Sequence, residues 1–383
     1  MKSLMPKKEK ILIFIDWFLP GYKAGGPIQS VNNIVFHLHD EFDISIVTSN
    51  KDLGESAPYN NVVCNAWQDK VNYKIIYLDE EHQNSKFYKG LLKSGDYNYV
   101  YFNSLFSVKF TLLPLWTYRK ESLKRILAPR GMVGKGALAI KPLKKKLFIS
   151  LFKLNGLHKK VVWHATSSLE KEEIESQFGN DLDVRIAPNL SSKMGMYQIK
   201  EKEEKGLNVF FVSRIAIKKN LLKALEYLSA TNSENTIKFS IIGPVDESEY
   251  WNSCEEYIKK MPKHVEVNYL GSIPNNRLKD TLKDQHVLLL PTMHENFGHV
   301  IMESWQNGCP VLISDQTPWI DIHEKHIGYA LSLSKPDEFV KQLNRFSEMN
   351  EDNFNKWSKS AYNFAEAFTQ KPQLVIDTKK LFK

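Results

Sequence analysis

Short apolar runs alternate with segments of helical periodicity along the whole chain. The runs have the length of strands, are rich in β-branched and aromatic residues, and end at polar, glycine or proline positions. Most of the segments between them have helical spacing, such as residues 30–39. Strands separated by helices join as right-handed parallel units. We therefore predict strands at residues 11–16, 42–48, 73–78, 97–103, 125–129, 161–166, 184–187, 209–213, 239–243, 265–271, 287–291, 311–314 and 329–332.

One polar segment interrupts this alternation near the middle of the chain. Residues 191–206 are charged and poor in apolar periodicity, which is typical of a linker. A chain of 383 residues also suits two domains better than one core. We predict an α/β protein of two doubly wound Rossmann-like domains, residues 1–190 and 207–352, that face a cleft. A C-terminal helical segment, residues 353–383, follows them.

Composition excludes several classes of protein. A hydrophobic content of 42% and an aromatic content of 12% exclude a disordered chain. No run of about 18 apolar residues would span a bilayer, and the apolar run 11–15 is too short for a signal peptide. Cys64, Cys254 and Cys309 lie far apart, so we expect neither a disulfide framework nor a zinc site. A reducing cytoplasm is the natural setting.

Positive charge is concentrated in the first half. Residues 1–190 contain 27 Lys and Arg against 19 Asp and Glu, whereas the remainder contains 25 of each. Between residues 109 and 160, 14 basic residues accompany a single acid, Glu121. Within this segment, residues 141–154 carry a helical stripe of leucines (143, 147, 151 and 154) with lysines on the opposite flank.

Two interpretations of this basic segment remain open. The segment either forms an ordinary amphipathic helix docked on its own domain, or presents a basic face to anionic lipid or to a lipid-diphosphate acceptor. Nucleic acid fits poorly, because the chain has no helix-turn-helix, RNP or zinc-finger pattern.

The most informative stretch is residues 291–319. Glu295 and Glu303 are separated by seven residues, after a buried strand and around a helix expected to begin near Gly298. Helix N-termini offer unpaired N–H groups and a positive dipole end, which suit a diphosphate. A carboxylate on either side suits the hydroxyls of a nucleotide sugar. The alternative is two solvated carboxylates, because the spacing alone is a weak signal.

Two further segments offer groups for a diphosphate. The loop 21–27, with Gly25 and Gly26, follows the first strand and opens a helix, although it fits neither a dinucleotide nor a Walker pattern. A purely structural turn is its alternative. Arg214 ends the first strand of the second domain, and Lys219 follows where a helix begins. Paired cations there would stabilise a diphosphate leaving group; Lys218 is a rival, and two surface cations are the alternative.

These motifs together resemble the retaining GT-B glycosyltransferases of family 4, the glycosyl transferases group 1, which include bacterial polysaccharide and lipopolysaccharide enzymes. The resemblance rests on residues 20–27, 213–219, 242–244 and 291–319 and covers nearly the full chain. Asn220 departs from the family pattern, which commonly has glycine after the lysine.

The resemblance implies a role for each of these residues. Glu295 contacts hydroxyls of the donor sugar, Glu303 contacts the ribose, and the glycine loop lies near the diphosphate and the acceptor. Arg214, Lys219 and Glu295 are the expected catalytic residues. The expected substrate-binding residues are Gly25, Gly26, Arg130, Gly243, Asn296, Phe297, Gly298, His299, Val300 and Glu303.

A catalytic group from the first domain is harder to assign. Many members of the family have a histidine in a loop where this chain has Arg130, which cannot act as a base. Arg130 is instead expected to hold phosphate or acceptor, or to anchor its loop. His164 is a second candidate, but a lone histidine at a strand end is more often structural. Asp181 and Asp183 form an Asp-x-Asp pattern that we interpret as solvated, and no metal is expected because Arg214 and Lys219 neutralise the diphosphate.

The sequence thus predicts a retaining hexosyltransferase. The donor is a nucleotide sugar, with UDP favoured over GDP, and the acceptor is a hydroxyl of a cell-surface glycan or lipid-linked molecule. The protein would be cytoplasmic, with peripheral contact to the inner face of the plasma membrane through residues 109–160. The resemblance also implies a return of residues 353–383 to the first domain, which the residues themselves leave open. A nucleotide-sugar epimerase of the same fold and a non-catalytic binding subunit are the alternatives.

Overall fold

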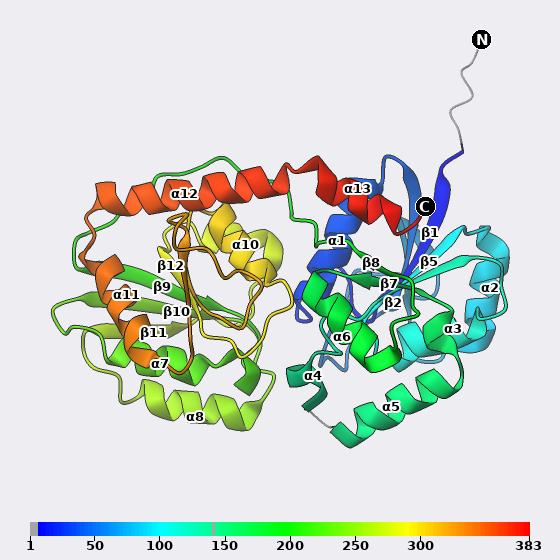
Figure 1. Cartoon of the computed structure of the whole chain (residues 1–383), viewed down its shortest axis with the longest axis horizontal. Coiled ribbons are helices and arrows are strands. Elements are labelled where there is room, and N and C mark those ends of the chain that lie inside the picture. Colours follow the sequence, from blue (N-terminus) through cyan, green and yellow to red (C-terminus); the bar gives the residue numbers. More distant parts are fainter. Residues whose placement is uncertain (1–6, 140–141) are drawn as a thin grey trace, which may run out of the picture. The chain divides into compact units, whose positions relative to one another are not determined.

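The computed structural model describes residues 7–139 and 142–383, and the chain divides into two compact units (Figure 1). Unit 1 contains the residues up to Ser192 together with Lys371–Lys383, and unit 2 contains Lys193–Gln370. Each unit is built around one sheet of mainly parallel strands. Among the described residues, no helix is both long and apolar enough to cross a membrane.

The sheet of unit 1 has eight strands in the order β3-β4-β2-β1-β5-β6-β7-β8. All neighbouring pairs are parallel except β3 with β4. The chain reverses its winding direction at β1, between β2 and β5. The strands are β1 (Glu9–Phe14), β2 (Phe42–Ser49), β3 (Trp67–Asp69), β4 (Lys74–Leu78), β5 (Tyr99–Asn103), β6 (Lys124–Ala128), β7 (Val162–Ala165) and β8 (Val184–Ile186).

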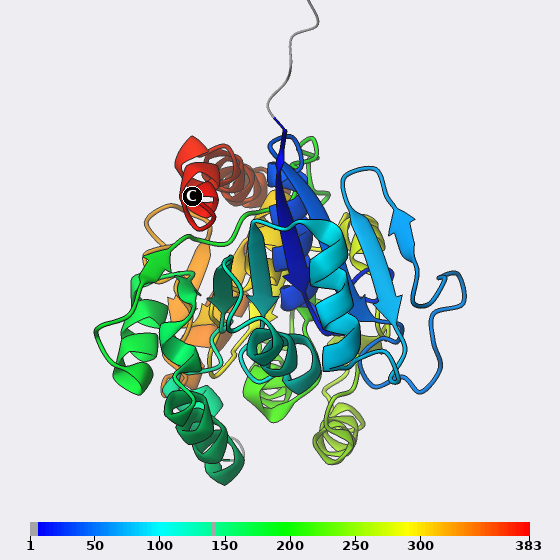
Figure 2. The same ribbon diagram turned by 90° about the vertical axis from the view of Figure 1, so that its right-hand side faces the viewer.

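Helices cover both faces of this sheet (Figure 2). Aromatic side chains fill the core between the layers; Phe14 meets Tyr88 edge-to-face at 5.2 Å, and Trp163 lies 4.7 Å from Phe178. The helices are α1 (Gly26–Leu38), α2 (Ser85–Gly95), the π-helix η1 (Val108–Leu112), α3 (Leu113–Thr117), α4 (Lys135–Ala139), α5 (Pro142–Leu154), the 3-10 turn η2 (Leu157–Lys159), α6 (Ser168–Phe178) and α13 (Pro372–Lys380).

The sheet of unit 2 has six parallel strands in the order β11-β10-β9-β12-β13-β14. They are β9 (Gly206–Val212), β10 (Thr236–Ile242), β11 (Val265–Tyr269), β12 (Val287–Leu290), β13 (Val311–Ser314) and β14 (Gly328–Leu331). The helices are the 3-10 turn η3 (Ile217–Lys219), α7 (Leu221–Ser229), α8 (Ser248–Ile258), α9 (Asn275–Thr281), α10 (His299–Gln306), α11 (Pro336–Glu348) and α12 (Glu351–Thr369).

All the predicted strands are confirmed, with shifts of a few residues at their ends. The edge strand β3 was not predicted, because three polar or half-exposed residues give no periodic signal. The helix predicted over residues 141–154 is confirmed for residues 142–154 as α5. It docks by Phe148, Ile149 and Phe152, and its four leucines are exposed. The helix therefore docks on its own domain, as one interpretation expected, but through this face and not through the leucine stripe.

From residue 193 on, the polar segment 191–206 belongs to unit 2. Two of its lysines, Lys200 and Lys202, are buried, and their ammonium groups donate to backbone carbonyls: Lys200 Nζ to Leu282 O at 2.9 Å, and Lys202 Nζ to Ser347 O at 3.0 Å. Burial lowers the pKa of Lys202 to about 8. The charge that marked this segment as a linker serves in part to satisfy carbonyls of unit 2.

The C-terminal residues pack in unit 1 and close its core. Phe382 is buried against Phe42 and Tyr99, both at 5.6 Å between ring centroids. Arg185 Nη1 donates to the carbonyls of Lys380 at 2.6 Å and Lys383 at 2.9 Å. These residues, far from unit 1 in sequence, are therefore part of its fold.

We predict that Phe382→Ala lowers the free energy of unfolding of unit 1 by about 3–5 kcal/mol, because it leaves a cavity in an aromatic cluster. Urea denaturation followed by tryptophan fluorescence measures this loss. Phe36→Ala, which removes an exposed ring on α1, is the matched control. Equal stability of the two variants would show that the C-terminal residues do not support unit 1.

Candidate functional site

Two loops of unit 2 are joined at the carboxyl edge of its sheet. Because β9 and β12 are neighbours, the loops that follow them leave the sheet side by side. Met293 N donates to Lys218 O at 2.8 Å, and Asn220 Nδ2 donates to Pro291 O at 3.0 Å. These bonds hold the segment after Arg214 against the segment that carries Glu295.

An ion pair between Lys219 and Glu295 connects the same two loops. The side chains are only 16% and 13% exposed, so the pair is mostly shielded from solvent. Asn220 directly after the lysine adopts the left-handed conformation, with φ of 64°. Asparagine tolerates this region better than most residues. It therefore makes the turn for which the family pattern has glycine.

Arg214 lies at the same edge and has its own counter-ion. Its Nη1 is 2.6 Å from Asp246 Oδ2, in the loop after β10, and the two side chains are 42% and 37% exposed. Exposed ion pairs contribute little to stability. The guanidinium can therefore be redirected to an incoming anion at small cost.

Gly243 is required by the close approach of two loops. Its φ is 144°, and a Cβ atom there would lie 1.9 Å from Ser213 O. Its backbone is also bonded on both sides, with Gly243 N donating to Gly271 O at 2.8 Å and Tyr269 Oη donating to Gly243 O at 3.0 Å. A side chain at this position would displace the backbone that carries Arg214.

The helix expected near Gly298 is confirmed as α10, which begins at His299. Gly298 is left-handed, with φ of 74°. The segment before it is fixed by Phe297, whose carbonyl accepts from Trp319 Nε1 at 2.6 Å and whose ring lies 5.4 Å from that indole. Glu295 and residues 296–300, including Asn296 and Val300, are thus held at the start of this helix.

Glu303 lies on α10, where it meets α9. Its Oε1 accepts from Asn275 Nδ2 at 2.9 Å. Burial raises the pKa of this carboxyl, and the bond from Asn275 opposes the rise. The bond to Asn275 fixes the orientation of one carboxylate oxygen.

In unit 1, Arg130 is held by three hydrogen bonds at the carboxyl edge of the sheet. It has φ of 57° and donates to Asn103 Oδ1 at 2.8 Å, Asn189 Oδ1 at 2.7 Å and Tyr101 Oη at 2.8 Å. The Nε and both Nη atoms of the guanidinium are thus engaged within the unit. This geometry favours the anchoring role among those expected for Arg130.

His164 is buried behind this arginine. Its Nε2 donates to Ala187 O at 2.8 Å, so Nδ1 accepts from Tyr101 Oη at 2.7 Å. Burial, aided by Arg130, lowers its pKa to about 3. A neutral, fully bonded imidazole acts here as a structural support.

The other residues singled out in the sequence lie elsewhere in unit 1. Gly25, with φ of 67°, precedes α1, and Gly26 is the first residue of that helix. Asp181 pairs with Lys159 at 2.6 Å, and Asp183 pairs with Arg185 at 3.0 Å, both on the surface. The Asp-x-Asp acids are thus bound to different cations.

Asp16 was not among the predicted site residues. It follows β1 at the point where the winding of the sheet reverses, which is where doubly wound folds bind ligands. Its Oδ1 accepts from Ser107 Oγ at 2.7 Å, and burial raises its pKa to about 6. Nearby in the topology, Asn103 ends β5, and its buried Nδ2 has no hydrogen-bond partner among the described residues. The available signal was an acid at the carboxyl end of the first predicted strand, residues 11–16.

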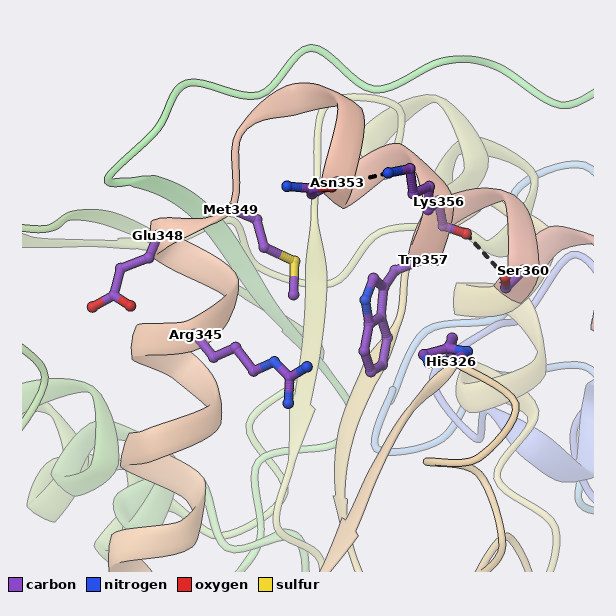
Figure 3. A pocket seen from close by; sticks show the side chains of 8 residues that line it. All are labelled: His326, Arg345, Glu348, Met349, Asn353, Lys356, Trp357 and Ser360. Carbon is purple, nitrogen blue, oxygen red and sulfur yellow. Dashed lines mark hydrogen bonds between the residues drawn. The ribbon is translucent and has the colours of Figure 1, made fainter.

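Unit 2 also has a cavity of about 520 Å³ away from this edge (Figure 3). Arg345 and Lys356 project from α11 and α12 beside Trp357, and His326 precedes β14. Arg345 lies 5.7 Å from the ring centroid of Trp357. Because His326 lies at the amino end of β14, this cavity is not part of the site at the carboxyl edge.

Comparison with known proteins bears on this site. Residues 196–364 match the family described as Glycosyl transferases group 1. An uncharacterized glycosyltransferase of Methanocaldococcus jannaschii is 26% identical over 138 residues, which are 36% of this chain and 35% of that protein. The match therefore spans about a third of that relative's length.

Solved structures resemble nearly the whole chain. Sucrose-phosphate synthase from Thermosynechococcus elongatus has a TM-score of 0.73 at 13% identity over 98% of each chain. Anabaena HepE in complex with UDP and glucose has a TM-score of 0.69 at 13% identity, over 97% of this chain and 98% of that one. Structural similarity at 13% sequence identity establishes the fold of this chain and nothing beyond it. The protein has the GT-B fold of two Rossmann-like α/β sheets, and its residues 196–364 match the glycosyl transferases group 1.

We predict that Asp16→Asn removes a pH-dependent loss of stability. A carboxyl whose pKa is raised on folding, from 3.8 to about 6, stabilises the folded state at low pH and loses that contribution as pH rises through this interval. The melting temperature of the variant relative to the wild type should therefore increase between about pH 4 and pH 7. Calorimetry at several pH values measures the difference, and Asp43→Asn, at an exposed position of β2, is the control. A difference independent of pH would contradict a buried titrating Asp16.

Proposed function

We propose that this protein is a retaining glycosyltransferase that moves a hexose-type sugar from a nucleotide sugar to an acceptor hydroxyl. The observation that carries the proposal is the Lys219–Glu295 pair, with Arg214, at the carboxyl edge of unit 2 and ahead of α10. This arrangement lies inside the segment that matches the glycosyl transferases group 1. It joins cations for a diphosphate to a carboxylate for sugar hydroxyls.

The donor would occupy the edge formed by the loops after β9 and β12. Arg214, Lys219 and the first turn of α10 bind the diphosphate, because cations and helix N-termini both stabilise anions. Glu295 accepts from hexose hydroxyls, and Glu303 accepts from the ribose. UDP is favoured over GDP as the nucleotide, in keeping with the UDP and glucose in the HepE structure.

Chemistry would proceed with retention at the anomeric carbon. The bond between that carbon and the phosphate oxygen breaks, and the acceptor oxygen bonds to the carbon from the same face. The acceptor proton passes to the departing phosphate, so the step needs no protein base and no metal. Arg214 and Lys219 stabilise the charge that grows on the diphosphate.

Unit 1 would bind the acceptor, a cell-surface glycan or a lipid-linked molecule. Its segment 109–160, with 14 basic residues against one acid, suits an anionic membrane surface or a lipid diphosphate. The protein would then be cytoplasmic and peripheral on the inner face of the plasma membrane, where such acceptors are assembled.

A nucleotide-sugar epimerase is the second candidate. It would share the diphosphate site and use acids of unit 1 for proton transfer, and Asp16 places a carboxyl with a pKa of about 6 at the edge of that sheet. Incubation with UDP- and GDP-sugars separates the two functions. Release of nucleotide supports the transferase, and formation of an isomeric nucleotide sugar supports the epimerase.

We predict that UDP, or alternatively GDP, raises the melting temperature of the wild type and that Arg214→Ala weakens this nucleotide's binding roughly ten- to hundredfold. The loss of one charge-assisted hydrogen bond, about 1.5–3 kcal/mol, accounts for that range. Thermal shift with titrated nucleotide measures it.

Lys263→Ala is the matched control, because it removes an exposed cation just before β11, at the opposite edge of the sheet. Its affinity should equal that of the wild type. Equal responses of Arg214→Ala and Lys263→Ala would remove Arg214 from the site.

A further inference from the structure

Helix α5 has two apolar faces. Its inner face carries Phe148, Ile149 and Phe152, with Phe148 edge-to-face on Phe106 at 5.0 Å. The other face points to solvent. Its leucines are largely exposed, at 82% for Leu143, 62% for Leu147, 50% for Leu151 and 83% for Leu154.

These leucines form one stripe rather than scattered positions. Their spacings of four, four and three residues keep them on one side of an α-helix, opposite the residues that dock it. Single exposed leucines are common in soluble proteins, but a contiguous apolar stripe marks an interaction surface. Docking of α5 on unit 1 does not need the stripe, since the inner face supplies that contact.

Lysines border the stripe on both sides. At 100° per residue, Lys144 lies on one flank, and Lys146 and Lys153 lie on the other; all three are exposed. No acid occurs in α5. An apolar stripe flanked by lysines is the pattern of a helix that lies in a membrane interface.

We propose that α5 lies in the interface of an anionic lipid bilayer, with its leucines among the acyl chains and its lysines at the lipid phosphates. The proposal deepens the membrane contact named in the proposed function and identifies the element that makes it. A second copy of this chain fits the stripe less well. A symmetric pairing of two α5 helices would bring the same lysines together without an acid to neutralise them.

Co-sedimentation with vesicles of phosphatidylcholine, with and without phosphatidylglycerol, tests the proposal. The full-length protein should bind the vesicles that contain phosphatidylglycerol and be released by salt. Leu147→Glu should weaken binding roughly tenfold or more, because it removes an inserted side chain and adds a repelled charge. Lys144→Gln and Lys146→Gln should each weaken it about fivefold and reduce the salt dependence.

Val71→Glu is the matched control, because it puts the same charge at a fully exposed apolar position outside α5. Far-ultraviolet circular dichroism and UDP binding, measured on every variant, separate loss of this surface from unfolding and from failure of the donor site. Equal vesicle binding by Leu147→Glu and Val71→Glu would overturn the proposal. So would a wild-type dimer in analytical ultracentrifugation that Leu147→Glu dissociates.

Discussion

The ion pair between Lys219 and Glu295 is the contact on which the site of unit 2 depends. It joins two loops that leave neighbouring strands, and two hydrogen bonds, from Met293 N to Lys218 O and from Asn220 Nδ2 to Pro291 O, hold those loops together. Desolvating two charges is costly unless each has a partner. In the absence of a donor the two groups satisfy each other. A diphosphate would give the ammonium a second acceptor, and sugar hydroxyls would give the carboxylate new donors, so the pair is poised to exchange partners.

At the carboxyl edge of the sheet in unit 1, two of the polar groups serve as structural supports. Arg130 and His164 make hydrogen bonds that tie the ends of strands β5 to β8 together, so neither is available as a proton acceptor. Asp16 has a carboxyl partly withdrawn from water at the reversal of winding. The chemistry proposed for the protein therefore rests on groups of unit 2, and the part proposed for unit 1 is to bind the acceptor and, through α5, the membrane.

Much of the fold could be predicted from the sequence, because buried parallel strands are continuous apolar runs and their order along the chain dictates βαβ winding. The start of α10 could also be predicted from local sequence, because Gly298 follows a buried strand and its loop. The partners of the site residues could not, since Asp246 meets Arg214 and Asn275 meets Glu303 across long sequence separations. Periodicity also could not decide which face of α5 is buried. Its leucine stripe and its Phe148-containing face both repeat at helical spacing.

The central claim is that Lys219 and Glu295 bind different parts of one donor. Isothermal titration of UDP and of a UDP-sugar bound by the wild type, against Lys219→Met, Glu295→Gln and the double variant, tests it most directly. The account predicts that Lys219→Met weakens both ligands, whereas Glu295→Gln weakens the UDP-sugar and leaves UDP as tight as in the wild type or tighter. Equal weakening of both ligands by Glu295→Gln, or unchanged binding of both by Lys219→Met, would contradict it.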